Sequence, residues 1–202
     1  MARPLLYPLS IHRPCPFPAF VRDNGCSRTS PGMEKNMFSD HLLARIGSAG
    51  PALEKSLIQE TRKIFSTLLG MDHLLHLPLS VDPASNFADC ISGLVGLAGE
   101  YNGLVSLHVS TRLAHRMACQ MLDIDEPTDE EVEDALGEVA NVLAGAFKRY
   151  LSEESLAIRL STPSIVSGKQ YVIHVAKKPE VMTLLFDLED EWFIAALAVE
   201  RD

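Results

Sequence analysis

The sequence of 202 residues lacks an uninterrupted apolar run of the roughly 18 residues that a transmembrane helix needs. It is also short of positive charge, because 18 Lys and Arg stand against 27 Asp and Glu, a net charge of -9. Nucleic-acid binding depends on clustered Lys and Arg that neutralise phosphates. The sequence therefore predicts no membrane span and no nucleic-acid partner.

Cysteine is scarce, and its spacing forms no motif. The four cysteines contain no CxxC pair, and Cys90 and Cys119 lie in apolar segments. Buried free thiols in a reducing compartment are therefore favoured over a disulfide or a metal site. His73 and His76 have no third ligand at a matching spacing. We expect a cytoplasmic protein with no metal ligands and no cofactor of its own.

Sequence signatures of small-molecule catalysis are also missing. Ser167-Gly168-Lys169 is similar to the end of a phosphate-binding loop, but Pro163 stands where that loop needs its first glycine. No nucleophile, general-base or cofactor motif is present elsewhere. A stand-alone enzyme acting on a small molecule is therefore disfavoured.

Residues 1–36 differ in composition from the rest of the chain. Six of the twelve prolines fall within residues 1–32, together with four arginines and the single acid Asp23. Proline interrupts every apolar run there before it reaches the length of a signal-peptide core. Two interpretations remain open: a disordered basic leader, or translated sequence upstream of a true start at Met33 or Met37. Composition favours the second, and residues 37–202 are expected to form one acidic domain.

Within this domain, hydrophobic periodicity predicts both helices and strands. We expect helices over Phe38–Ile46, from Pro51 to Gly70 with Leu68 on the buried face, from Ser110 or Thr111 to Met121, and over Asp129–Leu151. The expected strands are Leu74–Ser80 (weakly), Cys90–Ala98, Leu104–Val109, Leu156–Leu160, Gln170–Ala176, Val181–Glu189 and Trp192–Val199. Asn102-Gly103 predicts a hairpin between the second and third of these strands. The order indicates an α+β fold with helices packed on an antiparallel sheet.

The helix expected over residues 129–151 is the most informative element. Its apolar positions recur at steps of three and four, whereas Asp134, Glu138 and Asn141 lie on another face. Glu138 and Asn141 are three residues apart, so their side chains should point the same way. The neighbouring side chains are small and should let another surface approach the pair; they are Gly137, Ala140, Ala144 and Gly145. Thr128 and Glu131 have the spacing of a capping box.

The chain also contains a weak internal repeat. Ser56, Glu60 and Lys63 have the same spacing in the first long helix as Asp134, Glu138 and Asn141 in the second, and a strand-rich segment follows each helix. We infer a pseudo-twofold duplication. The first copy has Lys63 instead of an amide, so one intact constellation is expected, and Glu60 and Lys63 are more typical of a surface pair.

At these residues the sequence resembles the CheC/CheX/FliY chemotaxis phosphatase family, and most closely its CheX-like branch. That family's pattern is Asp or Ser, three residues, Glu, two residues, Asn, and then a Pro about twenty-two residues later. Here it reads Asp134, Glu138, Asn141 and Pro163, with a gap one residue shorter. The segments Gly93–Gly103 and Thr162–Gly168 also resemble the family, so the similarity spans roughly residues 50–200.

The resemblance implies a phosphatase that removes phosphate from the aspartyl phosphate of a CheY-like receiver domain. By the family's assignment, Asn141 positions the attacking water and Glu138 pairs with the receiver's active-site lysine. Asp134 and Pro163 would contribute to partner binding. Magnesium would be held by the receiver, and a homodimer is possible, as in CheX-like proteins.

From spacing alone, Glu138 and Asn141 are an ordinary solvated helix face, and Asp134 is equally consistent with an exposed helix acid. The family context favours a functional site. A rival hypothesis is a non-catalytic module that docks the same helix on a receiver or another signalling partner. The presence of both Glu138 and Asn141 favours catalysis, because docking alone does not need the amide.

Overall fold

The computed structural model describes residues 38–78, 86–152, 157–173, 179–189 and 191–200. The predicted N-terminal extension, residues 1–36, lies outside these ranges, and both interpretations of it stay predictions. The elements are α2 (Asp40–Arg45), α3 (Gly50–Leu69), β1 (Leu75–Leu77), β2 (Asn86–Gly99), β3 (Gly103–Ser110), α4 (Thr111–Leu122), α5 (Asp129–Lys148), β4 (Ile158–Leu160), β5 (Ser164–Val172), β6 (Glu180–Leu188) and β7 (Glu191–Val199).

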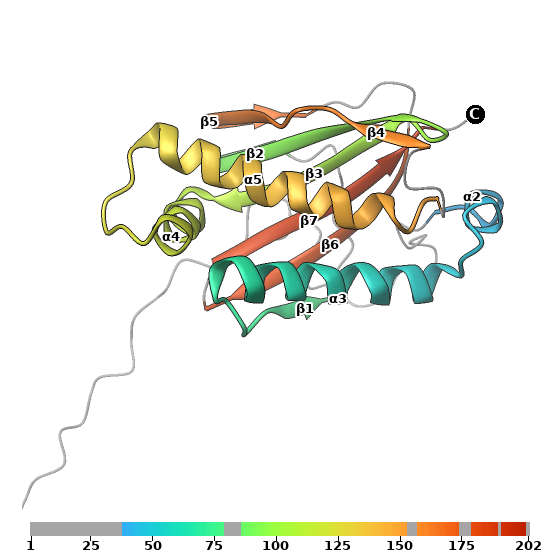
Figure 1. Ribbon diagram of the computed structural model, residues 1–202, viewed down its shortest axis with the longest axis horizontal. Coiled ribbons are helices and arrows are strands. Elements are labelled where there is room, and N and C mark those ends of the chain that lie inside the picture. The colour runs from blue at the N-terminus through green and yellow to red at the C-terminus, as the bar shows by residue number, and fades with distance from the viewer. Residues whose placement is uncertain (1–37, 79–85, 153–156, 174–178, 190, 201–202) are drawn as a thin grey trace, which may run out of the picture.

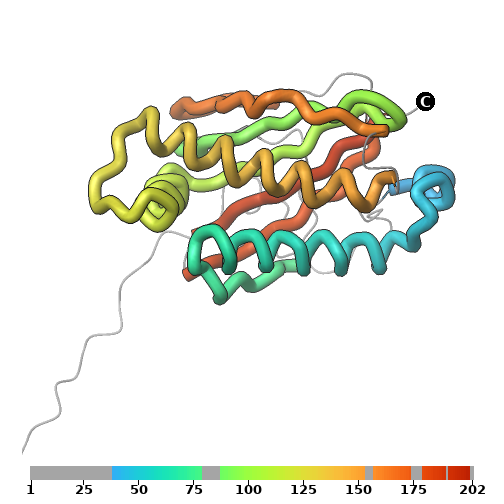
Figure 2. Tube along the Cα trace, viewed as in Figure 1, coloured from blue at the N-terminus to red at the C-terminus, as the bar shows by residue number. Residues whose placement is uncertain are grey.

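The strands form one antiparallel sheet, and the long helices α3 and α5 lie side by side across one face of it (Figure 1; the same arrangement is traced in Figure 2). The sheet has seven strands in the order β1-β6-β7-β3-β2-β4, and β5 also pairs with β2. Helix α4 packs against α5 near the start of that helix and also contacts α3, β2 and β3 (Figure 1). This arrangement confirms the predicted α+β class.

The strand order confirms the predicted duplication. If β1, β2 and β3 are exchanged with β5, β6 and β7, the pairing β1–β6 becomes β5–β2, and β6–β7 becomes β2–β3; both pairings are present. The central pairing β3–β7 is unchanged by the exchange. The same exchange relates α3 to α5. The molecule is therefore a pseudo-twofold repeat of one helix and three main strands.

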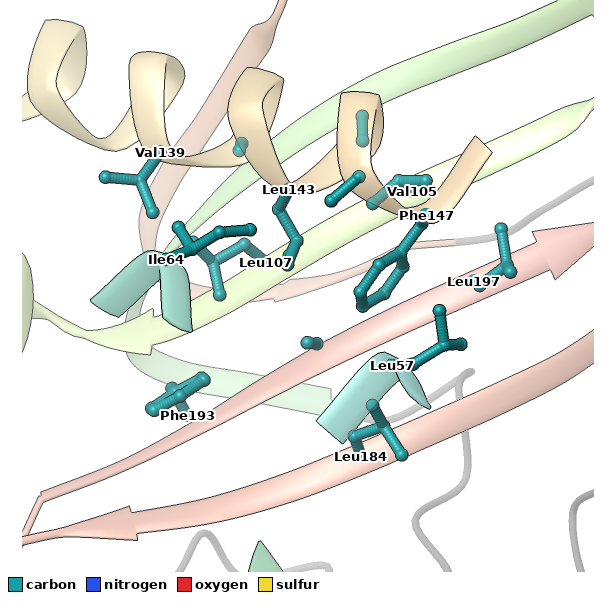
Figure 3. Packing of buried hydrophobic residues seen from close by; sticks show 14 of the residues in the cluster. Leu57, Ile64, Val105, Leu107, Val139, Leu143, Phe147, Leu184, Phe193 and Leu197 are labelled. Carbon is teal, nitrogen blue, oxygen red and sulfur yellow. The ribbon is translucent and has the colours of Figure 1, made fainter. Parts of the chain in front are cut away.

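The main core lies between the helices and the sheet. Apolar side chains from α3 and α5 meet those of β3, β6 and β7 there. Figure 3 labels ten of them: Leu57, Ile64, Val105, Leu107, Val139, Leu143, Phe147, Leu184, Phe193 and Leu197. On α3 the prediction for Leu68 was wrong, because Leu68 is 36% exposed and Phe65 and Leu69 are buried instead.

A second, smaller apolar cluster occupies the other face of the sheet. It contains Phe87, Cys90, Leu185, Trp192, Ile194 and Ala196. Because successive strand residues point to opposite faces, β7 is buried along its whole length. Ser106 and His108 are buried as well. The alternation in β3 therefore does not separate a core face from a solvent face.

Local signals explain most of the element boundaries. Gly70 ends α3 in the left-handed conformation that favours glycine, and Ser110 caps α4 by accepting a hydrogen bond from the Leu113 amide. The hairpin at Asn102-Gly103 joins β2 to β3 as predicted. The strand predicted over Gln170–Ala176 was placed too late, because β5 runs from Ser164 to Val172. Its residues are mostly exposed, so no apolar alternation marks it. Among the described residues, no helix is long and apolar enough to cross a membrane.

Candidate functional site

Helix α5 begins at a complete capping box. Thr128 Oγ1 accepts a hydrogen bond from the Glu131 amide at 3.3 Å, and the Thr128 amide donates to Glu131 Oε2 at 2.7 Å. Hydrogen bonds from the Thr128 backbone and side chain lower the pKa of Glu131. Three acids in the first turn also suit the positive end of the helix dipole. The start of the helix is thus fixed one turn before Asp134.

Small residues hold α5 close to the sheet. A Cβ atom built on Gly93 of β2 would lie 2.8 Å from the Cβ of Ala140, so the helix and strand approach to a distance that only glycine permits. Ala140 and Ala144 are buried in the core and do not surround the polar face, contrary to the prediction. Gly137 is buried but lines the groove, and a Cβ built on it would lie in ordinary contact with Pro163, 3.6 Å from the Pro163 Cβ.

The four predicted site residues lie in one groove of about 580 Å³. Asp134, Glu138 and Asn141 come from α5, and Pro163 comes from the turn before β5. The remaining lining residues are Met121, Leu122, Glu131, Glu133, Ala135, Gly137 and Ile165. The one-residue shortening of the gap before Pro163 therefore does not remove it from the site.

The polar side chains of this groove are available to an external partner. Asp134 and Glu138 are exposed, and Asn141 is half-buried. Within the part of the chain that the structure describes, the side chains of Glu138 and Asn141 have no hydrogen-bond or ion-pair partner. An amide and a carboxylate one helical step apart can hold a water molecule and bind a cationic group at the same time.

The corresponding positions of α3 have different surroundings. Glu60 Oε1 accepts a hydrogen bond from the Tyr150 hydroxyl at 3.1 Å, and Glu60 Oε2 lies 3.3 Å from Arg149 Nη2. The Glu60 side chain is only 20% exposed. Lys63 is exposed. The first copy thus differs from the second in two ways: it lacks the amide, and its glutamate is bound to the segment that follows α5.

A second cavity, of about 280 Å³, lies on the other side of the first turns of α5 and shares Glu133 with the groove. Asp89, His115, Asp129 and Lys169 also line it. No group of three or more His, Cys, Asp and Glu is arranged to hold a metal ion among the described residues.

Solved structures of chemotaxis proteins share this fold. A putative chemotaxis protein from Desulfovibrio vulgaris Hildenborough is 26% identical, with a TM-score of 0.60 over 73% of this chain and 96% of its own. Chemotaxis protein CheX from Vibrio vulnificus is 24% identical, with a TM-score of 0.60 over the same shares. A CheX–CheY–BeF3–Mg²⁺ complex from Borrelia burgdorferi matches at 16% identity and a TM-score of 0.54, over 73% of this chain and 97% of that one. No curated protein matches the chain by sequence.

The family model described as chemotaxis phosphatase CheX matches residues 91–187. The chain is similar to the CheC/CheX/FliY family, and most closely to its CheX-like branch. The matched region includes α5, the turn at Pro163 and every residue that lines the groove. The predicted resemblance is therefore confirmed.

Sequence reasoning missed the groove's apolar side in this CheX-like chain. Met121 was predicted only as the last residue of its helix, and Leu122 and Ile165 were not singled out as site residues. Their neighbourhood depends on how α4 and β5 pack around α5, and no local pattern encodes that packing.

Proposed function

We propose that the protein hydrolyses the aspartyl phosphate of a CheY-like receiver domain. The observation that carries the proposal is the pair of exposed Glu138 and half-buried Asn141 in the groove beside Pro163, whose side chains have no partners among the described residues. The match to the family model described as chemotaxis phosphatase CheX supports this reaction. The Borrelia burgdorferi CheX–CheY complex supports a CheY-like partner.

The reaction needs little covalent help from this chain. A water oxygen attacks the phosphorus in line, the bond between phosphorus and the aspartyl oxygen breaks, and the carboxylate leaves as inorganic phosphate is released. Positioning the water can supply much of the acceleration. Asn141 holds the water through its side-chain amide, and Glu138 pairs with the receiver's active-site lysine, which sets where Asn141 enters. Magnesium is bound by the receiver's own acidic residues.

Other parts of the proposal concern binding and assembly. Asp134 and Pro163 flank the pair and contact the receiver. The protein acts in the cytoplasm as part of two-component signalling in chemotaxis. A homodimer can form through β5, because β5 pairs only with β2 among the described strands and its other edge is open. Sedimentation of the purified protein tests this assembly.

The decisive variant is Asn141→Ala. Each single-domain receiver of the source organism is charged with acetyl phosphate and Mg²⁺, and loss of phosphate is followed with and without the protein. The wild type should accelerate the decay of at least one receiver, and Asn141→Ala should reduce that acceleration by about a hundredfold or more, a loss typical of a group that organises the reacting centre. Alanine is the best helix former, so the fold should survive.

Gln120→Ala is the matched control, because Gln120 is an exposed amide on α4 that does not line the groove. Its activity should equal that of the wild type. If the wild type binds a receiver without changing the decay rate, the protein is a docking module and the proposal is wrong. Full activity of Asn141→Ala would refute the role of the amide.

A further inference from the structure

The groove has an apolar rim that the proposed chemistry does not use. Leu122, the last residue of α4, lies beside Met121 on one side, and Ile165 of β5 contributes from another element. Leu122 is 44% exposed, and only two other large apolar side chains among the described residues, Leu75 and Val172, are at least as exposed. An exposed leucine is ordinary when it stands alone. Here it borders the groove that contains Asn141.

The same groove carries charge of one sign. Four acids line it, Glu131, Glu133, Asp134 and Glu138, whereas no Lys, Arg or His is among the described lining residues. A phosphorylated receiver pocket is itself rich in acidic groups. Docking of such a pocket against this wall requires cations on the receiver around the pocket, because uncompensated like charges repel at contact distance.

We propose that Leu122 and Met121 form a docking lip that selects receivers by an apolar side chain next to basic residues at the rim of the phosphorylation site. The inference rests on the proposed function and adds the chemistry of the partner's contact surface. The receiver's apolar side chain loses its water by packing against Leu122, while the receiver's neighbouring basic residues face Glu133 and Asp134. The lip binds the partner and does not touch the reacting phosphate.

Leu122→Ser tests the lip with the receiver that the wild type dephosphorylates. A truncated contact residue at the edge of an interface weakens binding, so KM should rise about five- to tenfold while kcat stays within about twofold. Leu75→Ser is the matched control, because Leu75 is 58% exposed on β1, at the far edge of the sheet from β5. Its KM should equal that of the wild type. Thermal melting of both variants reports on folding.

Glu133→Gln tests the charged wall. The wild-type KM should increase between low and high salt, and this dependence should weaken in Glu133→Gln but persist in Glu54→Gln, a half-exposed acid on α3. An unchanged KM in Leu122→Ser, an equal rise in Leu75→Ser, or a loss confined to kcat would overturn the proposal.

Binding of the beryllofluoride-loaded receiver, measured by calorimetry, separates this inference from the catalytic one. If the wild type binds but does not hydrolyse, the proposed reaction fails, and the ratio of dissociation constants between Leu122→Ser and wild type still decides whether the lip exists. A ratio of about five or more supports it, and equal affinities refute it.

Discussion

His108 is a buried histidine with a lowered pKa, on the face of the sheet opposite the helices. It is 5% exposed, and its ring stacks on Phe87 with centroids 4.3 Å apart. Nδ1 lies 2.6 Å from Ser92 Oγ, and Nε2 lies 2.9 Å from Ser106 Oγ. A neutral imidazole has one donor and one acceptor nitrogen, so both are satisfied. Burial lowers the pKa of His108 from 6.5 to about 3.

This shift predicts acid sensitivity. Between pH 6.5 and 3 the unfolded chain binds a proton at His108 that the folded chain does not bind. The contribution of neutral His108 to the free energy of unfolding is therefore complete above pH 6.5 and is lost as the pH falls below that value. The slope is up to about 1.4 kcal/mol per pH unit. Urea unfolding at several pH values should show a smaller loss of unfolding free energy in His108→Gln than in the wild type. Identical slopes would contradict this account.

At the scale of elements, the contact between β2 and α5 determines how deeply the site helix sits on the sheet. A Cβ on Gly93 would meet Ala140 Cβ at 2.8 Å and the Leu136 carbonyl oxygen at 3.4 Å. A separation below 3 Å forces one of the two elements to shift. The polar face of α5 is fixed relative to Pro163 by the same packing.

Gly93→Ala should therefore lower the free energy of unfolding by about 1–3 kcal/mol, as overpacking of a tight core does. Adding Ala140→Gly removes the opposing Cβ and should recover part of the loss, although glycine in a helix itself costs about 1 kcal/mol. Gly145→Ala is the control on α5, the helix that carries Ala140, because a Cβ built on Gly145 meets nothing within 4 Å. It should stabilise by up to about 1 kcal/mol. Strict additivity of the double variant would show that the two residues do not compete for space.

Elements with a strong local cause were predictable. The capping box of α5, the glycine that ends α3 and the Asn102-Gly103 turn each specify a boundary through hydrogen bonds or backbone conformation within a few residues. Strand β5 was misplaced because it is an exposed edge strand with no apolar alternation. Ser106 and His108 alternate with apolar residues along β3, yet both are buried, because a second apolar cluster lies on their face of the sheet.

At the scale of the whole molecule, duplication explains why half of the site could be predicted. Comparison of the two repeats singled out Glu138 and Asn141 on the second helix, because they have the same spacing as Glu60 and Lys63 on the first. The other half of the groove comes from α4 and β5, which meet α5 only through the tertiary packing. Long-range packing of this kind leaves no periodic trace in one sequence.

The duplication also raises the question of whether the α3 copy can be restored. Replacing Lys63 with Asn supplies the missing amide, but Glu60 remains bound to Tyr150 and Arg149, which directly follow α5. In an Asn141→Ala background, Lys63→Asn should leave receiver dephosphorylation at its spontaneous rate. Asn141→Ala alone is the reference, and circular dichroism verifies the fold. Recovery of activity would mean that the missing amide alone silences the first copy, whereas continued inactivity indicates that a free glutamate is needed beside it.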